Sequence, residues 1–135
     1  MKEVKQVIII RKKFPDGKGG NKGMRRGKEI AQGSHASGAF LVRRLKDKGK
    51  LDLNDLSEEV KIWIENGFTK VCLKIDTEEE IKELHRKASE KGLESHFIVD
   101  SGKTEFGGEK TITALSIGPN YREDIDEITS ELKLY

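Results

Sequence analysis

Two groups of polar side chains in this sequence could share one chemical task. Lys28, Gln32 and His35 recur at spacings of four and three residues, so on a helix they lie within an arc of about 60°. Asp100 and Thr104 lie far along the chain, just after a strand-like run. A carboxylate with an imidazole can activate water, and a lysine with a hydroxyl can hold a phosphate or a developing oxyanion. These residue types therefore favour a site for hydrolysis. The alternative is that the polar residues on the helix are simply solvated.

Several other catalytic motifs are missing. Gly102-Lys103-Thr104 could end a phosphate loop, but Phe97 stands where that motif needs glycine, and a strand rather than a helix follows. The absence of a Gly-x-Ser-x-Gly elbow disfavours a serine hydrolase of the α/β type. One cysteine and three scattered histidines lack metal-ligand spacing, so no metal site is predicted. Cys72, the single cysteine, lies in an apolar run and is expected to be buried and inert.

Charge is unevenly distributed along the chain. The net charge is +2, yet residues 1–50 hold 15 Lys/Arg against 4 Asp/Glu, and residues 51–135 hold 11 against 20. The Gly- and Lys-rich segment 12–27 carries much of this positive charge, and it includes Arg25 and Arg26. A basic face of this kind is typical of proteins that bind nucleic acid or phosphate. A flexible basic loop without a specific ligand is the competing interpretation.

Hydrophobic periodicity predicts one α/β domain over residues 1–135. The order of elements favours a four-stranded mixed sheet with helices on both faces, whose last two strands are antiparallel because no helix joins them. Segment 12–27 is expected to be a long loop without secondary structure, and Gly118-Pro119 is expected to end the last strand. The expected strands are 5–11, 69–75, 93–99 and 111–117, and the expected helices are 27–46, 57–67, 77–92 and 122–129.

The chain shows no targeting or membrane signal. No run approaches the roughly 18 to 20 apolar residues that cross a bilayer, and the first residues lack the apolar core of a signal peptide. A single cysteine excludes an intrachain disulfide and fits a reducing compartment. A cytoplasmic protein without a membrane partner is expected.

Six motifs occur together along nearly the whole chain. The motifs are Val7-Ile8-Ile9-Ile10-Arg11, Gly27-Lys28-x-x-Ala31-Gln32-x-x-His35-Ala36, Lys70-Val71-x-Leu73-Lys74, Asp100-x-Gly102-x-Thr104, Thr113-x-Leu115-x-Ile117-Gly118-Pro119 and Leu132-Lys133-Leu134. Together they resemble the peptidyl-tRNA hydrolases of type 2, the archaeal and eukaryotic kind. The resemblance implies a three-layer α/β/α sandwich with a four-stranded mixed sheet. It also implies hydrolysis of the ester that joins a peptide to the 3′ ribose of tRNA, with no metal or organic cofactor.

The resemblance also implies which residues act. The sequence departs from the family pattern at Ile30 and Ser101, where alanine is usual, and in a longer loop before Lys28. If the chain is the enzyme that the resemblance implies, its partner is peptidyl-tRNA. The alternative is a non-catalytic module that binds RNA or protein through the basic face. The sequence does not give the oligomeric state, and a homodimer is one expectation. The implied catalytic residues are Lys28, His35, Asp100 and Thr104, and the implied substrate-binding residues are Arg25, Arg26, Gln32, Gly102 and Thr113.

Overall fold

The computed structural model describes residues 2–102 and 106–135, which form both strands and helices. The strands are β1 (Val4–Arg11), β2 (Phe14–Pro15), β3 (Asn21–Lys22), β4 (Lys70–Ile75), β5 (Ser95–Asp100), β6 (Thr111–Tyr121) and β7 (Lys133–Leu134). The helices are α1 (Arg26–Lys48), α2 (Glu58–Glu65), α3 (Glu78–Glu90) and α4 (Arg122–Thr129), with a 3₁₀ turn at Leu53–Asp55. The mixed α/β class predicted from the sequence is confirmed.

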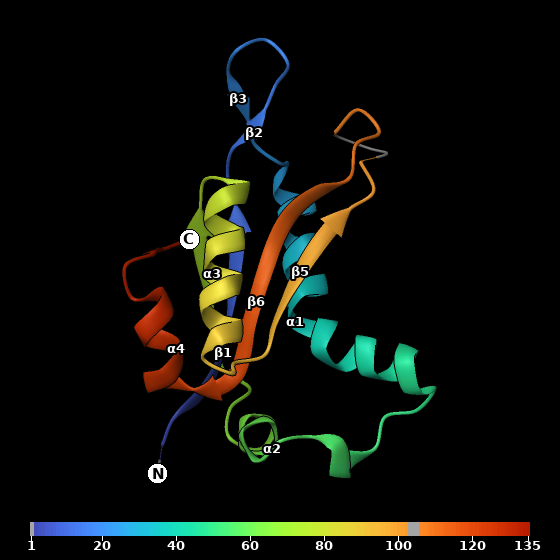
Figure 1. The fold of residues 1–135 in the computed structure, drawn as a ribbon, viewed down its shortest axis with the longest axis vertical. Coiled ribbons are helices and arrows are strands. Elements are labelled where there is room, and N and C mark those ends of the chain that lie inside the picture. Colours follow the sequence, from blue (N-terminus) through green and yellow to red (C-terminus); the bar gives the residue numbers. More distant parts are fainter. Residues whose placement is uncertain (1, 103–105) are drawn as a thin grey trace.

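The main sheet of the described residues has five strands in the order β5-β6-β1-β4-β7 (Figure 1). β1 runs parallel to β4, and the other neighbours are antiparallel, including the predicted pair of β5 and β6. The prediction of four strands is wrong by one, because Lys133 and Leu134 pair with Lys74 and Leu73 at the sheet edge. A strand of two residues shows no alternation of polar and apolar positions that a sequence could reveal.

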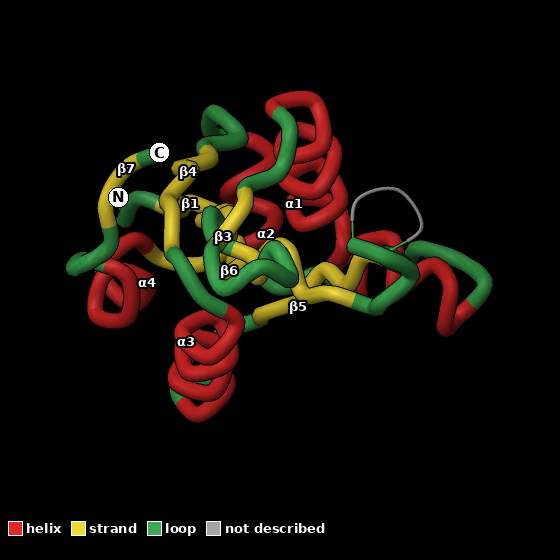
Figure 2. Tube along the Cα trace, turned by 90° about the horizontal axis from the view of Figure 1, so that it is seen from above, coloured by secondary structure: helices red, strands yellow, loops and turns green. Residues whose placement is uncertain are grey.

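Helices pack against both faces of this sheet. Seen from above in Figure 2, the strands lie between α1 on one side and α3 and α4 on the other. Successive residues of a strand point to opposite faces, and β1 is apolar on both. Ile8 belongs to a buried cluster with Ala36 of α1, and Ile9 belongs to a second cluster with Ile81 of α3. Because β1 is buried on both faces, it reads as a continuous apolar run.

Segment 12–27 is not the structureless loop expected from its glycines, because it contains the β2–β3 hairpin. Phe14 pairs with Lys22, and the Phe14 side chain is only 1% exposed, so it anchors the hairpin to the core. The Asp16 carboxylate accepts hydrogen bonds from the backbone N–H groups of Lys18 (2.7 Å) and Gly20 (3.0 Å). This side-chain cap holds the turn in one conformation. In Figure 1 the hairpin extends beyond the sheet near the start of α1.

Two other expectations are corrected. β6 continues past Gly118-Pro119 to Tyr121, since a shift of register in its pairing with β1 accommodates the proline, as bulges commonly do. Cys72 is exposed rather than buried, because β4 alternates and buries its neighbour Leu73 instead. In residues 2–102 and 106–135, no helix combines the length and the apolar character that a membrane crossing needs.

Candidate active site

Lys28 and Asp100 form the centre of the candidate site. Lys28 lies in the first turns of α1 and Asp100 is the last residue of β5, and the Lys28 Nζ donates to Asp100 Oδ1 at 2.6 Å. Their side chains are only 14% and 10% exposed. A cation near a helix N-terminus opposes the helix dipole, and here the carboxylate offsets it. The fold thus brings together the two groups of residues that the sequence separated by 72 positions.

The Asp100 carboxylate is held in its charged form. Burial raises its pKa, but the hydrogen bond from Lys28 Nζ and a second one from the Gly102 N–H to Oδ2 (2.8 Å) lower it. The charges of Lys28 and His35 act in the same direction, and the net effect places the pKa below its ordinary value. Each carboxylate oxygen accepts one of these bonds and keeps a further lone-pair position. Asp100 can therefore still accept a hydrogen bond from a bound water.

Gly102 gives the segment after β5 its shape. Its φ is +82°, and a Cβ placed on it would lie 2.0 Å from the Glu109 carbonyl oxygen. Its own carbonyl accepts a hydrogen bond from the Gly108 N–H at 2.9 Å. Only glycine combines this dihedral with so close a backbone approach. Gly102 thus serves the site by presenting its N–H to Asp100, and a direct contact with substrate stays a prediction.

Gln32 and Thr113 meet at the buried interface between α1 and β6. The Thr113 hydroxyl donates to Gln32 Oε1 at 2.6 Å, and the two residues are 0% and 4% exposed, respectively. Thr113 precedes the buried β6 core and Gln32 lies one turn after Lys28. The bond therefore fixes the rotation of α1 at the point where that helix supplies Lys28 to the site. Such a geometry suits positioning, and a role of this pair in binding substrate stays a prediction.

The remaining predicted residues have different environments. His35 is exposed on α1 and lies near enough to Asp100 to affect its pKa. Arg25 and Arg26 are exposed at the start of α1, beside the hairpin, as a nucleic-acid contact requires. Thr104 falls outside the described residues, so its predicted role is untested. The structure therefore brings Lys28, Asp100 and His35 to one region, with the two arginines on the same helix end.

Sequence analysis missed two polar contacts that also hold α1 in place. Ser37 Oγ donates to Gln6 Oε1 at 2.6 Å, and Gln6 Nε2 donates to the Ser37 carbonyl at 2.9 Å. Glu29 is 8% exposed and accepts hydrogen bonds from Lys12 Nζ (2.6 Å) and from the Tyr135 hydroxyl. The sequence signal for the first was a glutamine inside an apolar strand. The contact of Glu29 joins residues that are distant in the sequence, so no local pattern predicts it.

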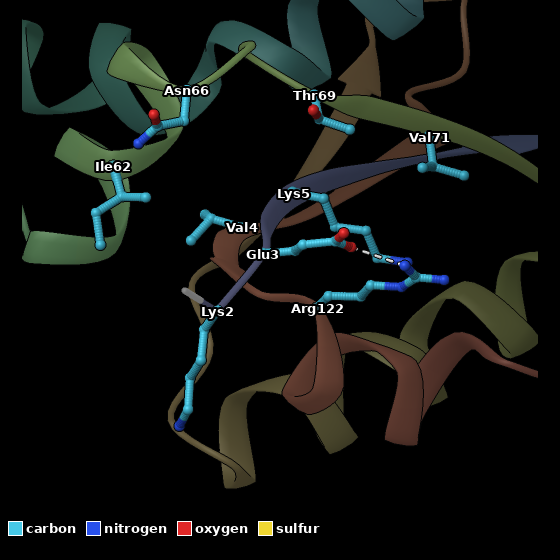
Figure 3. A pocket seen from close by; sticks show the side chains of 9 residues that line it. All are labelled: Lys2, Glu3, Val4, Lys5, Ile62, Asn66, Thr69, Val71 and Arg122. Atoms are coloured by element: carbon cyan, nitrogen blue, oxygen red, sulfur yellow. Dashed lines mark hydrogen bonds and ion pairs between the residues drawn. The ribbon is translucent and has the colours of Figure 1, made fainter.

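A separate hollow of about 700 Å³ lies at the other end of the sheet. Figure 3 shows it at the start of β1, between residues of β4, α2 and α4, with the ion pair of Glu3 and Arg122 (2.7 Å) on its wall. β5 and β1 run in the same direction, because both are antiparallel to β6, so Asp100 and this hollow lie at opposite ends. The carboxyl ends of strands are where α/β folds commonly place ligands. The Lys28–Asp100 pair is therefore the better candidate site.

Comparison with known proteins identifies the family of this chain. The model of the family described as peptidyl-tRNA hydrolase PTH2 matches residues 4–135. The chain belongs to the PTH2 family. A peptidyl-tRNA hydrolase of Methanopyrus kandleri is 40% identical over 131 residues, which cover 96% of this chain and 97% of that protein. A peptidyl-tRNA hydrolase of Methanocaldococcus jannaschii is 36% identical over 132 residues, which cover 97% of this chain and 99% of that protein. A probable peptidyl-tRNA hydrolase 2 of Dictyostelium discoideum is 35% identical, over 98% of this chain and 55% of that longer protein. The resemblance inferred from the motifs is confirmed.

Proposed function

We propose that this chain hydrolyses the ester between a peptide and the 3′ ribose of tRNA, releasing free tRNA for reuse. It is a peptidyl-tRNA hydrolase of the PTH2 family, an enzyme that acts on a carboxylic ester. The observation that carries the mechanism is the ion pair of Lys28 and Asp100, which is largely shielded from solvent and hydrogen-bonded at both carboxylate oxygens. No activated serine or cysteine is evident in the sequence, so water is the nucleophile.

The lowered pKa of Asp100 divides the tasks among the residues. A carboxylate that stays charged is a good acceptor for orienting water but a weak proton acceptor. His35 lies near this carboxylate, and histidine is the side chain that enzymes use most often as a general base, so His35 takes the proton of the attacking water. Lys28 stabilises negative charge on the terminal phosphate or on the leaving ribose oxygen. Thr104, by its place in the motif, donates a hydrogen bond to the carbonyl or fixes its own loop.

The alternative, a non-catalytic RNA- or protein-binding module, is not favoured. A site that only binds phosphate gains affinity from an unneutralised lysine. Here Asp100 neutralises Lys28 at 2.6 Å, which weakens phosphate binding and is useful only if the carboxylate has its own task. The names of the relatives agree with catalysis, since each is described as a peptidyl-tRNA hydrolase.

The deciding experiment is single-turnover hydrolysis of an N-blocked aminoacyl-tRNA beside equilibrium tRNA binding. Asp100→Asn keeps the size of the side chain and removes its charge, and the rate should fall by roughly 10²-fold or more. The tRNA affinity should hold or rise slightly, because one negative charge near the phosphates is gone. Asp76→Asn is the matched control, since Asp76 directly follows β4 at the same end of the sheet and is exposed.

The control should hydrolyse the substrate at the wild-type rate. If Asp100→Asn also stays within about threefold of that rate, the role of Asp100 in orienting the water is wrong, and His35 has to act without it. A wild-type chain without any hydrolysis would overturn the proposed function itself.

Three finer properties belong to the same proposal. Helices on both faces of the sheet support the three-layer α/β/α sandwich. A role in translation supports a cytoplasmic location. The homodimer is a prediction that sedimentation of the purified chain would test.

A further inference from the structure

The segment that carries the site has a single apolar anchor. Residues 101–110 contain one large apolar side chain, Phe106. Backbone hydrogen bonds join described residues of this segment to one another, with the Gly108 N–H donating to Gly102 O (2.9 Å) and the Glu109 N–H to Phe106 O (3.1 Å). Phe106 itself packs against the buried cluster under α1. Its ring thus ties this segment to the protein interior.

The partner of Phe106 is the aromatic residue that anchors the hairpin. The rings of Phe106 and Phe14 have centroids 4.8 Å apart and are tilted by 35°. The Arg11 guanidinium lies 4.2 Å from the centroid of the Phe14 ring, and the Lys22 ammonium lies 5.7 Å from the Phe106 ring. Cations at these distances are attracted to the faces of aromatic rings. Four residues of β1, the hairpin and the site segment therefore form one continuous stack.

The far end of this stack is rigid. Arg11 is 6% exposed, and it donates from Nε to the Lys13 carbonyl (2.9 Å) and from Nη1 to the Ile112 carbonyl of β6 (3.1 Å). Phe14, at 1% exposed, has no room to move without opening the core. A ring that stacks on Phe14 consequently inherits a position fixed by β1 and β6. In this way the central strands determine where the segment after Asp100 lies.

We propose that Phe106 is a positioning residue for the reaction: through Phe14 it fixes the turn at Gly102 and thereby the orientation of the Asp100 carboxylate. This proposal rests on the proposed function for its catalytic part alone. Gly102 N–H donates to Asp100 Oδ2, so a displaced turn withdraws one of the two bonds that aim the carboxylate. Small displacements of aligned groups cost much rate, about 10²-fold for roughly 1 Å.

The catalytic test compares three variants with N-blocked aminoacyl-tRNA. Phe106→Ala removes the anchor, and kcat should fall about 10-fold while KM stays within twofold. Phe106→Leu keeps an apolar group against Phe14 and should recover most of the rate. Phe68→Ala is the matched control: Phe68 also packs on an aromatic residue, Trp63, at 4.2 Å between ring centroids, but it lies just before β4, at the end of the sheet opposite Asp100. Its kcat should equal that of the wild type.

A second measurement reads the position directly. In Phe106→Ala, hydrogen exchange at the amides of Gly102 and Gly108 should speed up at least 10-fold, whereas the amide of Leu115 in central β6 should keep its protection. Unchanged exchange at Gly102, or a rise of KM with kcat unaltered, would overturn the positioning role. A wild-type chain that does not hydrolyse the substrate would overturn the proposed function alone, because the exchange experiment does not depend on activity.

Discussion

Lys28 Nζ and Asp100 Oδ1 are 2.6 Å apart, although 72 positions separate the two residues in the chain. One residue opens a helix and the other ends a strand, so the pair joins α1 to the far edge of the sheet. Both side chains are largely shielded from water, and shielding strengthens the attraction between opposite charges. The pair is thus at once a tertiary contact and the charged centre of the candidate site.

The pH dependence of this pair follows from its direction of titration. Burial raises the pKa of Asp100, but the bonds from Lys28 and Gly102 outweigh it and leave the folded-state pKa below 3.8, the ordinary value. A carboxylate with a lowered pKa stabilises the fold fully above about pH 4 and loses that contribution as the pH falls through its folded-state pKa. The difference in free energy of unfolding between wild type and Asp100→Asn should therefore shrink in strong acid.

Urea unfolding from pH 2 to pH 7 measures this difference. Between pH 5 and pH 7 it should be constant, since Asp100 stays ionised there. A single-turnover rate that fell on the acid side with a midpoint above pH 5 in wild type, but not in a variant of Asp100, would contradict the lowered pKa.

Gly102 and Gly107 provide a matched pair of substitutions in one segment. Both have positive φ, +82° and +61°, so alanine introduces comparable backbone strain at each. A Cβ at Gly102 would collide with the Glu109 carbonyl oxygen at 2.0 Å, whereas a Cβ at Gly107 would meet nothing within 4 Å. Gly102→Ala should lower the single-turnover rate about 10-fold or more, and Gly107→Ala should lower it little. Equal rates in the two variants would show that the close approach at Gly102 does not matter.

Two buried polar pairs separate stability from catalysis. Thr113→Val leaves Gln32 Oε1 without its donor, and Ser37→Ala does the same to Gln6 Oε1. Each loss should cost about 1 to 3 kcal/mol in urea unfolding. Only Thr113→Val should also slow hydrolysis, because Gln32 lies one helical turn from Lys28. An equal effect of both substitutions on the rate would mean that Thr113 acts through stability alone.

Salt dependence tests the basic patch at the start of α1. The slope of log affinity against log salt reflects the number of phosphates that the protein neutralises. Replacing Arg25 and Arg26 with Ala should weaken tRNA binding and reduce this slope by roughly one to two units. Lys82 and Lys87 on α3 lie on the other face of the sheet, and their replacement should leave the slope as it is. If the Arg25/Arg26 variant keeps the wild-type slope, these two arginines do not contact the tRNA phosphates.

Local patterns predicted the elements well. The helix predicted over 77–92 formed as α3, and Thr77 caps it by accepting from the Glu80 N–H. The strand-like run before Asp100 also formed where expected, because β-branched and aromatic residues favour a half-buried strand. Both features depend on residues that are close together in the sequence, so the sequence alone predicts them.

Contacts between distant segments could not be predicted in the same way. β7 exists because Lys133 and Leu134 pair with Lys74 and Leu73 at the edge of β4. The motif placed Lys28 near Asp100 only through the family resemblance, and the ion pair itself required the fold. The stack on Phe14 likewise joins segments that no periodicity links.

The bonds of Gln32 to Thr113 and of Ser37 to Gln6 attach α1 to two adjacent central strands. Between them lies Ala36, whose methyl group allows close packing but favours no particular alignment. Because both bonds are directional, they restrict sliding of α1 along its axis and rotation about it. A shift of α1 by one turn would break both bonds, so together they favour one register of the helix on the sheet. The alignment of α1 on the sheet is thus determined by directional hydrogen bonds as well as by apolar packing.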